Sequence, residues 1–182
     1  MDFFKKFLLF FTDIAETIVI AIAVFLLVWV FLIQAFRVQG SSMFPNFEDG
    51  EMILTNKITY RFSQPKRGDV VIFQSPASKK DLIKRIIGLP GETLSIENGK
   101  VEINGQDLEE KYLSVKTSSG NFLTDGNTYT IPNNNFIVLG DNRPNSQDSR
   151  EWGPVEKEYI IGKAWIIYWP LGKTSFVPSI SY

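Results

Sequence analysis

The distribution of apolar positions divides the chain into two unlike parts. From Thr17 to Phe36 the sequence reads TIVIAIAVFLLVWVFLIQAF, in which only Thr17 and Gln34 are polar. Twenty helical residues rise about 30 Å, the thickness of a hydrocarbon core. After Phe36 the apolar residues form short runs between turn residues, and no stretch keeps the 3.6-residue period of an amphipathic helix. The pattern predicts one transmembrane helix followed by a mainly β domain.

The first apolar segment has a second interpretation, a signal peptide that is removed. Such a peptide has an apolar region of only about 7–15 residues and then a cleavage site with small side chains. The sequence QAFRVQG, residues 34–40, is bulky at that point. We therefore favour a retained anchor at residues 13–36, after a cytoplasmic or interfacial N-terminus at residues 1–12. Two lysines precede the span and one arginine closely follows it, which favours an N-terminus inside the cell.

Residues 37–182 are expected to form an extracytoplasmic domain of antiparallel β-sheet. Alternation of apolar residues on both sides of Asn98-Gly99, the dipeptide preferred in tight type I′ turns, predicts a hairpin. The segment 104–134 is polar and is expected to be a small excursion from the core sheet. Further strands are predicted from the short apolar runs at residues 51–56, 68–73, 134–141 and 159–169.

Aromatic residues are frequent late in the chain. They could pack in the core, or they could form a belt at the membrane interface, where amphipathic rings are favoured. Both interpretations stay open for Trp152, Trp165, Tyr168, Trp169 and Phe176.

Composition restricts the chemistry that the domain can perform. The chain contains neither cysteine nor histidine, which excludes disulfides, thiolate metal sites and a Ser-His-Asp triad. Of its 19 basic and 20 acidic side chains, two and three precede position 37, which leaves 17 of each sign in residues 37–182. A balanced domain has no electrostatic footprint for nucleic acid. We expect no metal, cofactor or nucleic-acid partner, and the oligomeric state stays open.

Without histidine, a serine nucleophile needs another base. Ser42 lies in GSSMFPNF, residues 40–47, where a serine could be only a turn residue. Lys84 lies in DLIKRIIG, residues 81–88, among leucine and isoleucine side chains. Burial can lower the pKa of a lysine enough to leave its amine neutral, so Lys84 is a candidate base. The alternative is an edge-strand lysine that reaches solvent.

Three other motifs resemble sites of known chemistry. The stretch SQPK, residues 63–66, matches an S-x-x-K pattern that requires a helix, which Pro65 disfavours. GLPGE, residues 88–92, is followed by no G-K-[ST], so it is no phosphate loop. The stretch GDNRPNSQDSREWG, residues 140–153, fails the register of a calcium loop. It is either a solvated loop or a support for a buried base.

Together these stretches resemble the bacterial type I signal peptidases, which are membrane-bound Ser-Lys endopeptidases. SSMFPNF resembles the nucleophile motif S-M-x-P-T-L, and RGDVVIF resembles the R-G-D-[VI]-V strand. KRIIGLPGE is similar to the K-R-x-x-G-x-P-G-[DE] base motif, and residues 140–153 to G-D-N-R-x-x-S-x-D-S-R-x-x-G. The motifs occur in family order after an N-terminal span, and the resemblance extends to about Val155.

The resemblance implies a role for each matched residue. Ser42 would be the nucleophile, Lys84 the general base, and Ser146 would hydrogen-bond to the lysine and orient it. The main-chain N–H of Ser42 would donate to the oxyanion. Val38 and Ile83 would line shallow pockets for small side chains at the first and third positions before the cut.

The resemblance also implies a supporting frame. Asp148 would pair with Arg85 and Arg150, while Asp141 and Asn142 would shape the turn. The sequence departs from the family pattern at three positions. Asn46 and Phe47 replace the usual Thr and Leu, so we expect the loop to pack differently. Gly40 stands where some members have a serine that helps the oxyanion, which leaves the second donor open.

The expected protein is thus a serine endopeptidase that removes signal peptides from exported preproteins at the bilayer. Its expected location is the bacterial cytoplasmic membrane, crossed once, with the catalytic domain outside. One alternative is a self-cleaving Ser-Lys protease of the repressor type. Another is a non-catalytic, membrane-tethered β adaptor that binds export substrates.

Overall fold

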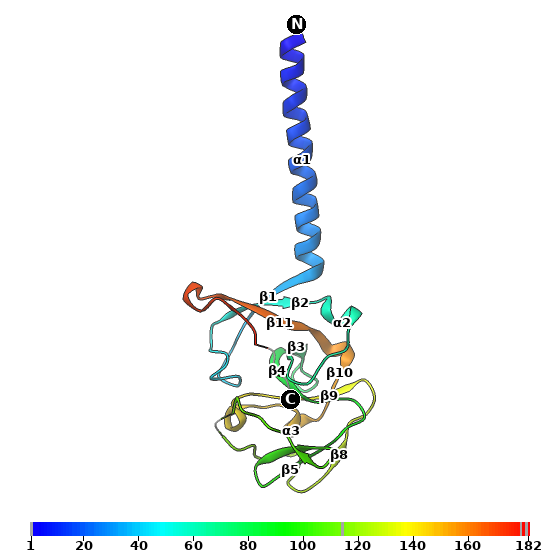
Figure 1. The fold of residues 1–182 in the computed structure, drawn as a ribbon, viewed down its shortest axis with the longest axis vertical. Helices are drawn as coiled ribbons and strands as arrows, with labels where there is room; N and C mark the ends of the chain where they lie inside the picture. The colour runs from blue at the N-terminus through cyan, green and yellow to red at the C-terminus, as the bar shows by residue number, and fades with distance from the viewer. Residues whose placement is uncertain (1, 114, 179, 181) are drawn as a thin grey trace. The chain divides into compact units, whose positions relative to one another are not determined.

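The computed structural model describes residues 2–113, 115–178, 180 and 182. It divides into two compact units, Met1–Gln34 and Ala35–Tyr182. Figure 1 shows the first as a continuous helix and the second as a compact domain of strands and loops.

The first unit is helix α1 (Asp2–Leu32). Within the described residues, α1 is the one helix long and apolar enough to cross a membrane, over Phe4–Val28, where the mean hydropathy is 2.3. The helix starts earlier than the expected span at residues 13–36, because FFKKFLLFF contains no glycine or proline to stop it. Met1 of the expected segment 1–12 lies outside the described residues. The helix also ends before Phe36, because the next residues form a β-strand.

The second unit contains a large antiparallel sheet of eight described strands. Its order is β1-β2-β11-β3-β4-β9-β10, and β12 pairs with β11. All four strands predicted from apolar runs are confirmed in this sheet. The strands are β1 (Ile33–Arg37), β2 (Met52–Asn56), β3 (Val70–Gln74), β4 (Asp81–Gly88), β9 (Asn135–Leu139), β10 (Val155–Glu156), β11 (Ile160–Trp169) and β12 (Ser175–Phe176).

A smaller sheet, of order β7-β6-β5-β8, contains the predicted hairpin. Asn98 and Gly99 both have positive φ, 53° and 83°, as a type I′ turn requires. The excursion at residues 104–134 supplies two of the strands, so it is anchored at both ends. In Figure 1 this sheet lies at the opposite end of the domain from β2. The strands are β5 (Thr93–Glu97), β6 (Lys100–Ile103), β7 (Gln106–Asp107) and β8 (Tyr129–Thr130).

Helix is scarce in the described part of the second unit, as the sequence predicts. Asp148 caps α3, because its side chain accepts a hydrogen bond from the Arg150 main-chain N–H. The helical segments are all short: α2 (Thr59–Phe62), α3 (Ser149–Trp152), η1 (Arg143–Asn145), η2 (Lys157–Tyr159) and η3 (Leu171–Lys173).

The core uses alternate side chains of the central strands. Ile83 packs in one cluster with Val38, Met43 and Phe47, whereas Ile86 packs in another. Burial of such side chains contributes roughly 1.5–3 kcal/mol each. The core therefore fixes both β4 and the loop at residues 40–47.

The late aromatic residues divide between the two interpretations given for them. The ring centroid of Trp152 lies 5.9 Å from that of Phe73, a core residue. In contrast, Trp165, Trp169 and Phe176 are 42%, 51% and 70% exposed. Trp152 is thus half-buried against the core, Tyr168 is also half-buried, and the other three rings are exposed.

Candidate active site

Lys84 lies in the interior of the large sheet. Its strand, β4, runs between β3 and β9, and Lys84 is paired with Val71 of β3. The side chain is only 3% exposed. The interpretation of Lys84 as an edge-strand lysine reaching solvent is therefore wrong.

Ser42 lies on the loop between β1 and β2. The next residue, Met43, and Phe47 are both buried in the core, so the loop is held down on either side of an exposed turn. Ser42 Oγ lies 2.6 Å from Lys84 Nζ, within hydrogen-bond distance. The structure thus brings together a hydroxyl and an amine 42 residues apart in the chain.

Burial lowers the pKa of Lys84 to about 8. Desolvation is the largest cause, since the charged amine loses its hydration inside the protein. Asp148 and Asp141 raise the pKa, and Arg150 lowers it. At mildly alkaline pH a large fraction of the amine is neutral and can accept a proton.

Arg85, the residue after Lys84, is also buried and pairs with Asp141. Its Nε and Nη2 atoms donate to the two carboxylate oxygens at 2.9 and 2.6 Å, and Nη1 donates to the Gly68 carbonyl at 2.9 Å. The expected pairing of Arg85 with Asp148 is therefore wrong. Arg85 lies opposite Leu139 on β9, and Asp141, two residues further on, extends from the same strand end.

Asp148 instead pairs with Arg150, whose Nε donates to Oδ1 at 2.8 Å. The other carboxylate oxygen accepts from Arg150 Nη2 at 2.8 Å and from the Gly140 N–H at 3.0 Å. Arg150 Nη2 also donates to the carbonyls of Arg143 and Ser146. The predicted pairing of Asp148 with Arg150 is therefore present. Because Asp148 also binds Gly140, it connects the two ends of the 140–150 loop.

The 140–150 loop is hydrogen-bonded to the nucleophile loop. The Asn142 main-chain N–H donates to the Ser42 carbonyl at 3.0 Å, and its side-chain amide donates to the Ser41 carbonyl at 2.9 Å. Asn46 Nδ2 donates to Asp141 Oδ2 at 2.9 Å. The unusual asparagine at position 46 thus binds the same carboxylate as Arg85.

Ser146 lies close to Ser42 but does not contact Lys84 by a hydrogen bond. Its Oγ is buried and has no hydrogen-bond partner among the described residues. A Cβ added at Gly140 would lie 2.2 Å from this Oγ and 2.5 Å from the Ser42 carbonyl oxygen. The hydroxyl is therefore near the dyad while its expected bond to the lysine is not formed.

The possible oxyanion donors differ in their availability. Among the described atoms, the Ser42 main-chain N–H has no acceptor, whereas the Gly40 N–H donates to Asp49 Oδ1 at 2.7 Å. Gly40 has a φ of +81°, and a Cβ there would meet nothing within 4 Å. The Gly40 amide is therefore already engaged.

A groove of about 480 Å³ opens beside the dyad. Ile83 lines it as expected, whereas Val38 is buried in the core and does not line it. Two cations lie along the groove, Arg37 and Lys80. Among the described residues, no three carboxylates gather as a metal site would require.

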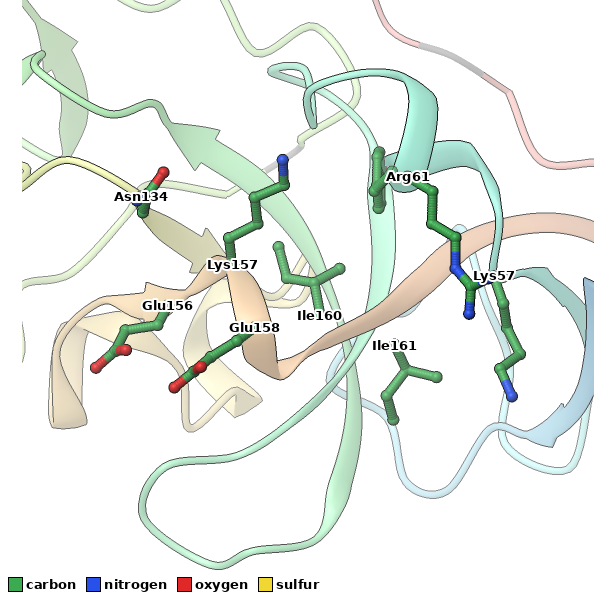
Figure 2. A pocket seen from close by; sticks show the side chains of 9 residues that line it. Lys57, Arg61, Asn134, Glu156, Lys157, Glu158, Ile160 and Ile161 are labelled. Atoms are coloured by element: carbon green, nitrogen blue, oxygen red, sulfur yellow. The ribbon is translucent and has the colours of Figure 1, made fainter. Parts of the chain in front are cut away.

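A larger hollow of about 570 Å³ lies elsewhere. Figure 2 shows Glu156, Lys157 and Glu158 along one segment, and Lys57 and Arg61 across from them. It shares no lining residue with the groove, and none of its residues was predicted to act in the site. Size alone therefore does not identify the active site.

Three buried or half-buried polar residues that contact the site's arginines or are such an arginine were not predicted from the sequence. Arg143 is buried and pairs with Glu110, and the Tyr112 ring lies against Arg85. Arg143 is the arginine of the G-D-N-R motif, so its presence in that motif could have indicated a role in the site. Glu110 and Tyr112 lie in the polar excursion, where no periodic pattern indicated burial.

Comparison of the sequence with known protein families shows to which family the chain belongs. The model of the signal peptidase family, peptidase S26, matches residues 11–169. The chain belongs to this family. It is therefore a serine endopeptidase that removes signal peptides from preproteins, which sets aside the repressor-type and adaptor alternatives.

Two similar proteins are themselves signal peptidases. The chain is 37% identical over 166 residues to a signal peptidase I of Leptolyngbya laminosa, which covers 87% of this chain and 79% of that protein. It is 37% identical over 164 residues to signal peptidase I T of Bacillus subtilis strain 168, which covers 87% and 85%. A crystal structure of a signal peptidase I from Enterococcus faecalis V583 is 33% identical, with a TM-score of 0.49, over 56% of this chain and 97% of that one.

The Gly140→Ala substitution tests the close approach of the two loops. The added methyl group would overlap the Ser42 carbonyl and Ser146 Oγ. Displacing the nucleophile by about 1 Å can reduce turnover by about 100-fold. We expect that loss in a peptide-cleavage assay, whereas Gly172→Ala, at an open position, should keep full turnover. Normal turnover in Gly140→Ala would contradict the contact.

Proposed function

We propose that Ser42 is the nucleophile of this endopeptidase and Lys84 its general base. The observation that carries the proposal is the 2.6 Å separation of Ser42 Oγ and Lys84 Nζ within a buried setting. A serine hydroxyl attacks an amide only when a base removes its proton. The lowered pKa of Lys84 supplies that base without histidine.

In the first half of the reaction, neutral Lys84 takes the proton of Ser42 Oγ as this oxygen attacks the scissile carbonyl. The carbonyl oxygen becomes an oxyanion, to which the Ser42 main-chain N–H donates. Collapse of the tetrahedral intermediate breaks the C–N bond, and the ammonium of Lys84 protonates the leaving amine. An acyl-enzyme remains on Ser42.

In the second half, neutral Lys84 takes a proton from water, which attacks the acyl carbonyl. The ester C–O bond breaks, and the proton returns from Lys84 to Ser42 Oγ. Ser146 would orient the lysine after a rotation of its side chain about χ1, which would move Oγ toward Nζ. Such orientation by a neighbouring group is a common part of nucleophilic sites.

The substrate is proposed to lie in the groove beside the dyad, with small side chains at the first and third positions before the cut. Ile83 supports this preference, because its apolar side chain lines the groove next to Lys84. Val38 belongs to the same buried core cluster as Ile83 and would shape the pocket only indirectly, through the packing of this cluster.

The anchor is proposed to cross the bacterial cytoplasmic membrane once, with the N-terminus inside and the catalytic domain outside. The length and hydropathy of Phe4–Val28 support the crossing, and Lys5 and Lys6 support the orientation. The exposed rings of Trp165, Trp169 and Phe176 would suit contact with lipid. Attachment to the bilayer would bring enzyme and preprotein together.

Removal of the nucleophile tests the dyad directly. We expect Ser42→Ala to reduce cleavage of a signal-peptide substrate by at least about 10⁴-fold, and Lys84→Ala to do the same, because dyad members act as a unit. Ser41→Ala is the matched control, because that hydroxyl makes no hydrogen bond among the described residues. Undiminished turnover in Ser42→Ala, with an unchanged melting temperature, would contradict the proposal.

The pH profile tests the state of the base. The pKa of Lys84 is lowered to about 8, and only the neutral amine accepts a proton. Activity should therefore rise about tenfold per pH unit below this value and level off above it. Lys157→Gln, a change in the other hollow, should leave the midpoint in place. A profile that is flat from pH 6 to 9 would rule out Lys84 as the base.

Peptides with single changes test the pocket. We expect a substrate with alanine at the first and third positions before the cut to lose at least about tenfold in kcat/KM when the first becomes leucine. Leucine at the second position should be tolerated. Equal cleavage of all three peptides would contradict a pocket for small side chains.

A further inference from the structure

The guanidinium group of Arg85 is hydrogen-bonded along its edges and is covered on one face by the ring of Tyr112. Its hydrogen bonds to Asp141 and Gly68 use donors in the guanidinium plane. The Tyr112 ring lies over the group, with 4.7 Å between Arg85 Cζ and the ring centroid. A desolvated guanidinium over an aromatic face is attracted to it and shielded from water. Tyr112 therefore completes the burial of the residue next to Lys84.

Tyr112 is itself fixed by its hydroxyl. The hydroxyl donates to Glu110 Oε1 at 2.6 Å and accepts from Arg143 Nη2 at 3.3 Å. The Tyr182 hydroxyl donates to it at 3.0 Å. Few orientations of the ring satisfy all three partners, so the ring stays over Arg85.

Glu110 pairs with the second buried guanidinium of the site. Arg143 donates to both carboxylate oxygens, at 2.9 and 2.5 Å, and its Nε donates to the Gly140 carbonyl at 3.0 Å. Gly140 lies against the Ser42 carbonyl oxygen. Glu110 is thus linked to the nucleophile loop through Arg143 and Gly140.

The charges of this cluster balance only with Glu110 included. In three buried ion pairs, Arg85 binds Asp141, Arg143 binds Glu110, and Arg150 binds Asp148. Buried arginines require such partners, because an unpaired buried charge is strongly destabilising. Two carboxylates come from the 140–150 loop, and the third comes from the polar excursion.

We propose that Tyr112 is a positioning residue for the dyad, a role that rests on the function proposed above. Its ring fixes Arg85, which fixes Asp141, which binds the nucleophile loop through Asn46. Tyr112 does not line the groove beside Ser42. Loss of the ring would admit water to Arg85 and loosen Asp141, so turnover would fall while substrate binding changed little.

The experiment compares two substitutions in the full-length chain in detergent. Tyr112→Phe keeps a ring that can cover Arg85 and loses the hydroxyl that limits its orientation, whereas Tyr112→Leu loses the ring altogether. We expect kcat to fall by about 10- to 100-fold in Tyr112→Leu, with KM within about threefold, and to stay within about threefold in Tyr112→Phe. Tyr159→Leu is the matched control, because it removes a similar contact, between that ring and Lys79, and neither of these two residues lines the groove.

Each outcome bears on the proposal. A kcat of Tyr112→Leu within twofold of the unsubstituted chain would overturn it, and so would an equal loss in Tyr112→Phe or in Tyr159→Leu. If Tyr112→Leu does not fold, Tyr112→Met takes its place with the same expected result, because methionine is close to leucine in volume and also has no ring. Ser42→Ala in the same assay separates the two ideas: retained cleavage there would refute the proposed function, whereas normal turnover in Tyr112→Leu alone would refute only the positioning role.

Discussion

The site depends on keeping one amine neutral beside one hydroxyl. Burial of Lys84 lowers its pKa, but the negative charges of Asp148 and Asp141 raise it. Each of these carboxylates is bound to an arginine. The ion pairs therefore have an electrostatic consequence besides holding loops together, because they offset negative charge that would otherwise favour the ammonium form.

Lys84 is positioned by a β-strand, whereas Ser42 is positioned by a loop. Lys84 lies on β4, a strand that is hydrogen-bonded to β3 on one edge and to β9 on the other, so the backbone of the strand is fixed on both edges. Ser42 lies on a loop, which has no such ladder and is held instead by the buried side chains of Met43 and Phe47 and by hydrogen bonds from Asn142. A loop gives the nucleophile an exposed approach to substrate, and the core limits how far it can move.

The parts that the sequence predicted are those with a local signal. Apolar alternation indicated β4 and the hairpin, and the four motifs indicated Ser42 and Lys84. The partner of Arg85 had no local signal, because it depends on the register between β4 and β9. The end of α1 was also misplaced, since pairing of Ile33–Arg37 in a sheet competes with helix formation for the same apolar residues. Tyr112 belongs to a polar excursion, where only tertiary contacts create burial.

Asn46 shows how a departure from the family pattern can be accommodated. Asp141 Oδ2 accepts from both Arg85 and Asn46, so one oxygen joins the base strand to the nucleophile loop. An amide at this position donates a hydrogen bond without adding charge, whereas a carboxylate would repel Asp141. Because both donors share one acceptor, the effects of substituting them should not add: once Arg85 is lost, Asp141 is a weaker anchor for Asn46 as well.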